Sequence, residues 1–292
     1  MSVSVIVPTY YRPDDLVELL VSLIGQSVKP LEVIVIDDTP IDVVRKVVVD
    51  YQIRFGNAGV ELYYIRNPRV RSASVARNIG IKEAKGAILL FVDSDIVLYP
   101  DYIQKIVEVF KKYDAVGVQG WIVNLKPVTF PLVQAFKRMF FIGSYRRNGY
   151  KFYEYPFPLT GIINCEAFRG ANMAFRSNIF KGFRFDENLR YYSYNEDLLL
   201  SYSVFRQYPK GLFSTPYAKC VHKISKGGRM KSSDVKYHMN QCRRYVLTKL
   251  FGVRGIILYH WQNVGILSRE IALKLVKDLG AKSLIRMDFE EE

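Results

Sequence analysis

Up to Gln119, short apolar runs alternate with longer segments in which apolar residues recur at helical spacing. The short runs predict strands at Val3–Val7, Leu31–Ile36, Val60–Ile65, Ala87–Val92 and Ala115–Gln119. The periodic segments predict helices at Pro13–Gly25, Ile41–Tyr51, Ser74–Ala84 and Asp101–Lys112. Because strand and helix alternate with short links, the pattern indicates an α/β fold with a mostly parallel central sheet flanked by helices.

Polar residues follow several of the predicted strands, at Thr9–Arg12, Asp37-Asp38 and Asp93–Asp95. Because ligands bind at the carboxyl ends of parallel strands, we expect these groups to converge on one edge of the sheet. In an extended segment Asp93 and Asp95 point to the same side, where two carboxylates can hold a divalent cation and, through it, a diphosphate. Taken alone, an Asp-x-Asp triplet is more often a solvated turn.

The alternation of strand and helix weakens after about Lys126. Residues 126–165 are aromatic, basic and interrupted by prolines, which indicates a substrate-shaping insertion or a mobile flap. A helix with an apolar face is expected within residues 191–206. Helical periodicity returns after Lys231, where an apolar stripe consists of Val235, Met239, Cys242, Val246 and Leu250.

The charge of the chain is unevenly distributed. The net charge is +14, yet residues 1–125 contain 14 Lys and Arg against 15 Asp and Glu, a net of −1. Residues 126–190 (11 against 4) and 223–292 (14 against 7) each carry +7. Basic regions suit anionic lipid head groups or phosphorylated substrates, although scattered charges are more often only solubilising. Nucleic acid is disfavoured because acidic residues converge in the neutral first part.

Hydrophobic residues make up 49% of the 292 residues, so a large core can form. The three cysteines, Cys165, Cys220 and Cys242, form no CxxC pair. This spacing disfavours a zinc knuckle or disulfide framework and favours a reducing compartment. The N-terminus lacks the features of a signal peptide, and no apolar stretch reaches the length of a membrane span. We therefore expect a cytoplasmic location.

Common nucleotide-binding and hydrolase motifs are absent from the sequence. No GxGxxG follows the first strand, which disfavours a dinucleotide dehydrogenase, and no GxxxxGK[ST] indicates a P-loop. A GxSxG nucleophile elbow is also absent. What remains is a carboxylate-rich strand edge suited to a metal ion and a phosphate.

Four segments resemble, in order and spacing, the family-two glycosyltransferases: Val5–Tyr10, Val35–Asp38, Ala76–Gly80 and Phe91–Asp95. Members of that family are inverting transferases that use nucleotide sugars and have the GT-A fold. The resemblance implies a GT-A catalytic domain at residues 1–225, with a nucleotide-sugar-binding half at 1–125 and an acceptor half at 126–225. Residues 226–292 are then a C-terminal helical extension.

The resemblance implies a role for each matching residue. It implies that the nucleotide-sugar donor is bound by Pro8, Thr9, Tyr10, Arg12, Asp37, Asp38, Arg77, Asp93 and Ser94. Of these, Asp38 contacts the base or ribose, and Arg77 faces the nucleotide or its phosphates. Asp95 binds Mg²⁺ or Mn²⁺, which bridges the diphosphate. His222 is either a further metal or phosphate contact or a structural histidine.

Two positions depart from the family pattern. Members often have Asn where Tyr11 stands, and Gly-Ser where Thr39-Pro40 stand. Tyr11 is expected to reshape the pocket, and the stiffer Thr39-Pro40 turn puts backbone contacts there in question.

The acceptor side is implied further along the chain. Gly170, Ala171 and Asn172 resemble the family's acceptor-side loop, which lies close to the donor sugar. Trp121, which follows a predicted strand, either lines the acceptor pocket or belongs to the core.

Glu196 and Asp197 resemble the family's Glu-Asp pair, whose aspartate is the general base. An acceptor hydroxyl is a poor nucleophile, so a carboxylate within hydrogen-bond reach can take its proton as the new bond forms. One base opposite the leaving group implies a single displacement with inversion. The plainer interpretation of the pair is helix capping, because acids favour first turns.

The tail from Ser232 to Gly280 mixes amphipathic helix with basic residues. Either it lies in a membrane interface, peripheral to the inner face of the cell membrane, or it packs as a helical pair against the catalytic domain. Together with the charge at 126–190, this favours a glycan or lipid-linked acceptor at an anionic membrane surface.

Two alternatives to a glycosyltransferase remain. A sugar-phosphate nucleotidyltransferase has a similar sheet but needs a glycine-rich loop with Arg and Lys after the first strand, and Pro8–Pro13 differs from that. A non-catalytic basic module that binds membrane surfaces would account for the charge but leave the converging acids unexplained.

Overall fold

The computed structural model describes residues 1–125, 131–142, 159–190, 193–225, 227 and 232–278. The chain forms two compact units. The first comprises Met1–Leu125 and Pro158–Cys242, and the second comprises Lys126–Phe157 and Arg243–Glu292. The domain boundaries predicted at 125/126 and 225/226 stay predictions. Much of the predicted insertion, at 126–130 and 143–158, lies outside the described residues.

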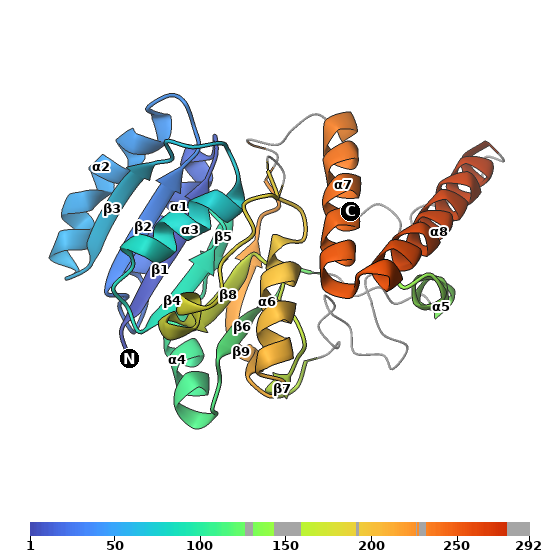
Figure 1. The fold of residues 1–292 in the computed structure, drawn as a ribbon. Helices are drawn as coiled ribbons and strands as arrows, with labels where there is room; N and C mark the ends of the chain where they lie inside the picture. The colour runs from blue at the N-terminus through green and yellow to red at the C-terminus, as the bar shows by residue number, and fades with distance from the viewer. Residues whose placement is uncertain (126–130, 143–158, 191–192, 226, 228–231, 279–292) are drawn as a thin grey trace. The chain divides into compact units, whose positions relative to one another are not determined.

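The described part of the first unit contains a nine-stranded sheet (Figure 1). Its strands are β1 (Val3–Thr9), β2 (Glu32–Asp37), β3 (Glu61–Arg66), β4 (Ile88–Val92), β5 (Ile96–Leu98), β6 (Gly117–Ile122), β7 (Ile163–Asn164), β8 (Asn172–Arg176) and β9 (Leu212–His222). The strand order is β3-β2-β1-β4-β8-β6-β9-β5, and β7 pairs with β9. The strands predicted from sequence correspond to β1, β2, β3, β4 and β6, with bounds shifted by a few residues.

The sheet is mixed rather than parallel throughout. β1 pairs in parallel with β2 and β4, β2 with β3, and β6 with β9. β8 lies between β4 and β6 and runs against both, and β5 and β7 run against β9. The parallel part therefore carries the predicted ligand edge, and the α/β fold class is confirmed.

Sequence periodicity did not predict β5, β7, β8 and β9. β5 and β7 are too short for a period to show, and β9 contains Pro216, which disfavours a strand assignment. The proline lies where the register between β6 and β9 shifts, between the pairs Gln119–Ser214 and Trp121–Lys219. A register shift tolerates a residue that cannot donate to the ladder.

Helices cover both faces of the sheet in the first unit. They are α1 (Pro13–Ile24), α2 (Val43–Asn57), α3 (Ala73–Glu83), α4 (Tyr102–Lys112) and α6 (Glu196–Gln207), with a 3₁₀ helix at Ser177–Lys181. Side chains alternate along β1, so that Val5 and Val7 pack in the core formed with α1, α2 and α4. Ile6 packs on the opposite face, in the core formed with α3, α6 and the 3₁₀ helix.

The close packing of α3 on the sheet depends on Gly80. A Cβ atom at this position would lie 2.4 Å from Cγ2 of Ile6, which is far too close for two carbon atoms. The absent side chain lets the helix that carries Arg77 rest directly on β1. This explains physically why glycine stands in the Ala76–Gly80 segment.

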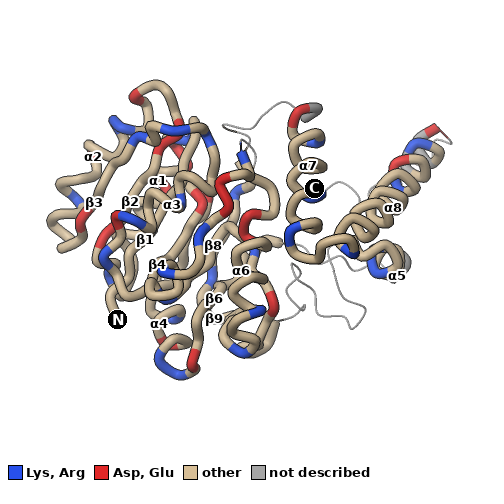
Figure 2. Tube along the Cα trace, in the orientation of Figure 1, with Lys and Arg blue, Asp and Glu red and all other residues tan. Residues whose placement is uncertain are grey.

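The second unit is helical in its described residues. It contains α5 (Pro131–Met139), the end of α7 (Ser232–Phe251) and α8 (Val253–Asp278). α7 and α8 are separated by Gly252, whose φ of 59° lies in the left-handed region that glycine adopts easily. Figure 2 shows that most of α8 is uncharged, with Lys and Arg near its two ends. No described helix combines the length and the apolarity that crossing a bilayer would need.

Candidate active site

The polar groups predicted to converge do meet at the carboxyl edge of β1, β2 and β4. Thr9 is paired with Asp37 in the β1–β2 ladder, and the amide of Asp38 donates to the carbonyl of Thr9 at 3.0 Å. β4 lies on the other side of β1 and leads directly into Asp93. The chain order of the strands thus places residues from three separate motifs side by side.

The two aspartates after β2 have different surroundings. Asp37 is fully buried, and its carboxylate accepts hydrogen bonds from the Thr39 amide at 2.8 Å and the Tyr64 hydroxyl at 2.9 Å. Asp38 is only partly buried and accepts a hydrogen bond from Nδ2 of Asn67 at 2.5 Å. Burial raises the pKa of Asp38 to about 6, although the hydrogen bond from Asn67 opposes the rise. Of the two, Asp38 is therefore the more accessible.

Asn67 was missed by the sequence reasoning. It follows β3, whose carboxyl end meets the same edge as β1 and β2. The rule that selected the residues after the first, second and fourth strands would have found it if it had been applied to the third strand as well.

Tyr11 adopts a backbone conformation that few residues favour. Its φ is 52°, in the left-handed region that asparagine tolerates better than an aromatic residue. The Tyr11 amide donates to Oγ1 of Thr39 at 2.9 Å. The two departures from the family pattern, at Tyr11 and Thr39, therefore contact each other. Beside them, the guanidinium of Arg71 lies 3.6 Å from the ring centroid of Tyr10.

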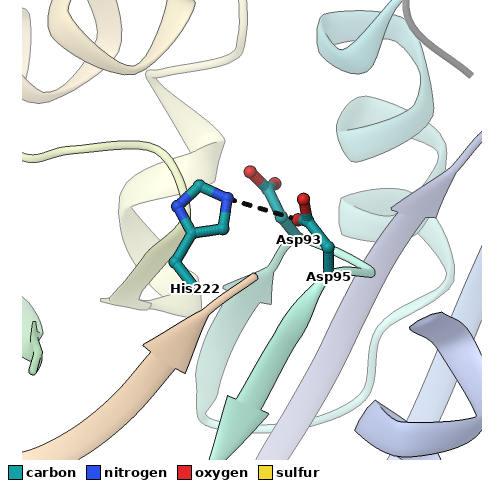
Figure 3. A group of neighbouring side chains, drawn as sticks. All are labelled: Asp93, Asp95 and His222. Atoms are coloured by element: carbon teal, nitrogen blue, oxygen red, sulfur yellow. Dashed lines mark ion pairs between the residues drawn. The ribbon is translucent and has the colours of Figure 1, made fainter. Parts of the chain in front are cut away.

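Asp93, Asp95 and His222 point toward one another (Figure 3). Asp93 follows β4, Asp95 precedes β5, and His222 ends β9, which pairs with β5 so that His222 lies opposite Ile96. Ligand atoms of the three side chains all lie within 4.8 Å of one another. The antiparallel β5–β9 pair, which the sequence did not predict, therefore brings a distant histidine to the Asp-x-Asp motif.

Asp95 is held almost completely out of water, with a side chain that is 1% exposed. Its Oδ2 contacts Nη1 of Arg12 at 2.9 Å and accepts the Ser225 amide at 3.1 Å. Nε2 of His222 lies 3.3 Å from Oδ1, yet Oδ1 accepts no hydrogen bond. Burial alone would raise the pKa of Asp95, but His222 and Arg12 hold it below its usual value.

The donor set fits a divalent cation. A buried carboxylate oxygen without a hydrogen-bond donor is costly unless something else satisfies it, and Oδ1 of Asp95 is such an atom. Two ligands of one ion with bonds of about 2.1 Å lie at most about 4.2 Å apart, so atoms within 4.8 Å need only small side-chain adjustments. Carboxylates suit Mg²⁺ and Mn²⁺, and the imidazole favours Mn²⁺.

Arg12 contributes to this arrangement through other protein groups. Besides Asp95, its guanidinium donates to the carbonyl of Ser225 at 3.2 Å and that of Gly227 at 2.8 Å. The sequence reasoning placed Arg12 near the nucleobase. In the structure its guanidinium contacts Asp95 and two backbone carbonyls of the segment after β9.

Arg77 connects the metal-ligand candidates to α6. Its side chain is 3% exposed, and its guanidinium pairs with Asp93 at 2.8 Å and with Glu196. The resemblance implied that Arg77 faces the nucleotide, whereas in the structure two carboxylates take its charge. Burial raises the pKa of Glu196, with Arg77 opposing and Asp197 adding to the rise.

Asp197 lies in the first turn of α6, mostly buried, and is held by two backbone amides. Oδ1 accepts from Leu198 at 2.8 Å and Oδ2 from Gly170 at 2.5 Å. The bond to Leu198 agrees with the capping interpretation, but the bond to Gly170 ties the carboxylate to the predicted acceptor-side loop. Burial raises the pKa of Asp197, although these amides and Arg77 lower it.

The acceptor-side loop is anchored to the sheet. The amide of Asp93 donates to the carbonyl of Ala171 at 3.1 Å, and Asn172 is fully buried in β8. Nε2 of Gln119, which the sequence reasoning missed, donates to the carbonyl of Arg169 at 2.5 Å and to Oδ1 of Asn172 at 3.3 Å.

The remaining predicted residues have simpler positions. Pro8 and Thr9 end β1, and the hydroxyl of Thr9 is buried without a hydrogen-bond partner. Ser94 is buried between Asp93 and Asp95, and Trp121 lies on β6, partly exposed.

Comparison with known proteins agrees with this geometry. Residues 4–186 match the family described as Glycosyl transferase family 2. An uncharacterized glycosyltransferase of Haemophilus influenzae is 34% identical over 109 residues, which are 37% of this chain and 34% of that protein. The uncharacterized glycosyltransferase YibD of Escherichia coli is 37% identical over 105 residues, covering 33% of this chain and 27% of YibD. The matches thus span about a third or less of these relatives.

Solved structures of S. aureus TarS share the fold. One has a TM-score of 0.55 and 20% identity, and the likeness covers 85% of this chain and 39% of that chain. TarS 1-349 in complex with UDP-GlcNAc has a TM-score of 0.55 and 18% identity, with coverage of 92% and 73%. At such identities the likeness concerns the fold alone, and it confirms the predicted GT-A architecture.

Proposed function

The chain belongs to glycosyl transferase family 2, and from this premise we propose that it transfers a sugar from a nucleoside-diphosphate sugar to an acceptor hydroxyl with inversion. One observation carries the proposal. Asp93, Asp95 and His222 cluster at the sheet edge, and Arg77 joins Asp93 to the Glu196-Asp197 pair. A metal-binding group and a buried carboxylate base thus belong to one connected set of side chains.

The donor is proposed to be a uridine, guanosine or thymidine diphosphate sugar. TarS 1-349 binds UDP-GlcNAc, which makes uridine the first choice to test. Asp38 offers a carboxylate that can accept hydrogen bonds, and Asn67 offers a side-chain amide. Both lie at the edge of the sheet where the base or ribose would lie. Thr9 adds a buried hydroxyl without a partner, and Pro8 and Tyr10 flank it.

Asp93, Asp95 and His222 are proposed to hold Mn²⁺ or Mg²⁺. When bound, the ion would neutralise charge that develops on the diphosphate leaving group. Arg12 and the Ser225 amide keep Asp95 ionised and fixed, because both contact its Oδ2. Oδ1 is thereby left for the cation.

Arg77 is proposed to act as a positioning residue. Its guanidinium orients Asp93 toward the cluster and Glu196 toward the start of α6. Its positive charge also limits the repulsion between these carboxylates. Direct contact between Arg77 and phosphate stays a prediction.

Asp197 is proposed to take the proton of the acceptor hydroxyl. Both its oxygens are oriented by backbone amides, Oδ1 by Leu198 and Oδ2 by Gly170. Because burial raises its pKa, Asp197 is a better proton acceptor than an exposed aspartate would be. The anchored loop at Gly170, Ala171 and Asn172 would position the acceptor beside it, with Glu196 and Trp121 as further contacts.

The acceptor is proposed to be a glycan or a lipid-linked glycan at an anionic membrane surface, on the cytoplasmic face. The support is the basic charge at 126–190 and 223–292. A non-catalytic basic module is the second candidate. It would need neither the orphaned oxygen of Asp95 nor the oriented Asp197.

A thermal-shift screen tests the donor proposal. UDP, GDP and dTDP are added with and without Mn²⁺, and binding raises the apparent stability by mass action. We expect a shift for one nucleotide that depends on the metal. If no nucleoside diphosphate shifts the melting temperature under either condition, the enzyme proposal fails and the binding module is favoured.

A further inference from the structure

The solvent-facing side of α8 carries many large apolar residues, with the exposed His260 and Ser268 between them and Asp278 at its end. Its exposed large apolar residues are Val253, Ile257, Trp261, Val264, Leu267, Ile271 and Leu275. Their exposed fractions range from 44% to 73%. Successive members are three or four residues apart, so at about 100° per residue they form one stripe along a single face of the helix. We call this set the α8 stripe.

The opposite side of α8 is already used for packing within the second unit. A Cβ atom at Gly255 would lie 1.9 Å from the carbonyl oxygen of Leu247 in α7, and one at Gly265 would lie 2.4 Å from Cγ of Phe140. Gln262 is buried and donates to the carbonyl of Phe141 at 2.8 Å. Gly255, Gln262 and Gly265 thus face inward together with the buried Tyr259, while seven large apolar side chains face outward, which is unusual for a surface helix.

Basic side chains accompany the stripe. Arg254 and Lys274 are exposed at its borders, and Arg138 is exposed at the end of α5. A hollow of about 600 Å³ lies between the helices, lined by Arg138, Met139, Phe141, Arg254, Ile257, Leu258 and Trp261. The indole N–H of Trp261 donates to the carbonyl of Met139 at 2.9 Å and fixes the ring at this hollow. In Figure 2 Lys and Arg lie on α5, at the end of α7 and near both ends of α8, and Asp and Glu also lie near the far end of α8.

We propose that the α8 stripe binds an anionic phospholipid bilayer, with α8 lying in the plane of the interface. Seven outward apolar side chains can enter the acyl boundary, and the arginines at the border can contact lipid phosphates. The hollow places two guanidinium groups beside an aromatic ring, the combination found at the polar–apolar boundary of a membrane. That this surface would bring the enzyme to an acceptor at the membrane rests on the proposed function. The binding of the α8 stripe to a bilayer does not.

The charge pattern favours a bilayer over a second copy of the chain. Only an antiparallel arrangement of two copies along α8 would bring Arg254 near the exposed acids Glu270 and Asp278 at the other end of the helix. An anionic lipid surface supplies a negative charge for every basic residue at once.

Vesicle flotation of the full chain tests the proposal. The variant Ile257→Asp/Leu267→Asp puts two carboxylates on the stripe at positions that are already exposed. Val49→Asp/Ile53→Asp makes the same chemical change on the exposed face of α2 and serves as the matched control. Vesicles contain phosphatidylglycerol and phosphatidylcholine in equal parts, or phosphatidylcholine alone. The UDP-induced thermal shift is measured for each variant to confirm that the fold and the donor site are intact.

The expected result is binding to the anionic vesicles that falls about tenfold or more in the stripe variant and is retained in the α2 variant. Binding should weaken with added salt. Trp261 gives a second readout in a Trp121→Phe background, since the chain has two tryptophans, and its emission should shift to shorter wavelength on anionic vesicles.

Several results would overturn the proposal. One is absence of vesicle binding by a chain that still responds to UDP, which would leave the proposed function standing. Another is equal loss in both variants. A third is a dimer in light scattering that the stripe variant abolishes, since the stripe would then be a self-interface. Conversely, vesicle binding without any nucleotide response would keep this surface and refute the enzyme proposal.

Discussion

Asp38→Asn is expected to stabilise the free protein near neutral pH. Burial raises the pKa of Asp38 from 3.8 to about 6, so the folded protein holds a proton that the unfolded chain has already lost. The folded state therefore binds more protons than the unfolded state between these two values, and stability falls as pH rises from about 4 to about 6. Asparagine cannot ionise, so the variant avoids this loss while still accepting the hydrogen bond from Asn67.

The size of the effect follows from the shift. Each pKa unit corresponds to about 1.4 kcal/mol, so a shift of about two units amounts to about 3 kcal/mol. Asp38 is only partly buried, and solvent screening reduces this to about 2 kcal/mol. The free energy of unfolding of the variant should thus exceed that of the wild type by about 2 kcal/mol at pH 7 and by little at pH 4.

Urea unfolding across this pH range measures the difference. Asp42→Asn, at an exposed carboxylate paired with Arg66, is the control for removing one surface charge. Asp38→Asn should also bind UDP about tenfold more weakly at pH 7, because an ionised hydrogen-bond acceptor for the base or ribose is lost. A stability difference between variant and wild type that does not change with pH would refute the reasoning.

Three further predictions concern the site. Asp197→Asn should lower the transfer rate by about 10²–10⁴-fold while the UDP-induced thermal shift stays near that of the wild type; loss of nucleotide binding would count against the base assignment. Asp95→Asn should disturb the metal dependence of nucleotide binding more than Asp93→Asn does, because only Asp95 has a buried oxygen without a donor; the reverse order in a Mn²⁺ titration would contradict this. Arg77→Met should lower the free energy of unfolding by about 3 kcal/mol, because it leaves Glu196 and Asp93 without their buried cation, with Arg77→Lys in between; unchanged urea unfolding would argue against the positioning role.

The sequence by itself determined the first half of the fold. Apolar runs ending in Pro8, Asp37 and Asp93 predicted β1, β2 and β4, and helical periodicity predicted α1 to α4. These elements succeed one another with short links, so the information that specifies them is local. The convergence of their polar ends also followed, because parallel strands have their carboxyl ends on one edge.

Only the tertiary structure decided how the separate motifs combine. The pairing of β5 with β9 brings His222 to Asp95, and Pro216 and the brevity of β5 conceal that pairing from any periodicity. Arg77 pairs with Asp93 and also with Glu196, which lies 119 positions further along the chain, and no local pattern records this second contact.

The surface of α8 shows the same division. Its sequence predicted a helix with apolar and basic residues but left open whether the apolar side packs inward or meets a partner. In the structure the glycines at 255 and 265 lie on the packed side of α8, where a Cβ would meet Leu247 and Phe140, and the large apolar residues from Val253 to Leu275 lie on the exposed side. Composition and spacing thus determine which elements form, whereas the side that each element buries depends on which neighbours fit against it.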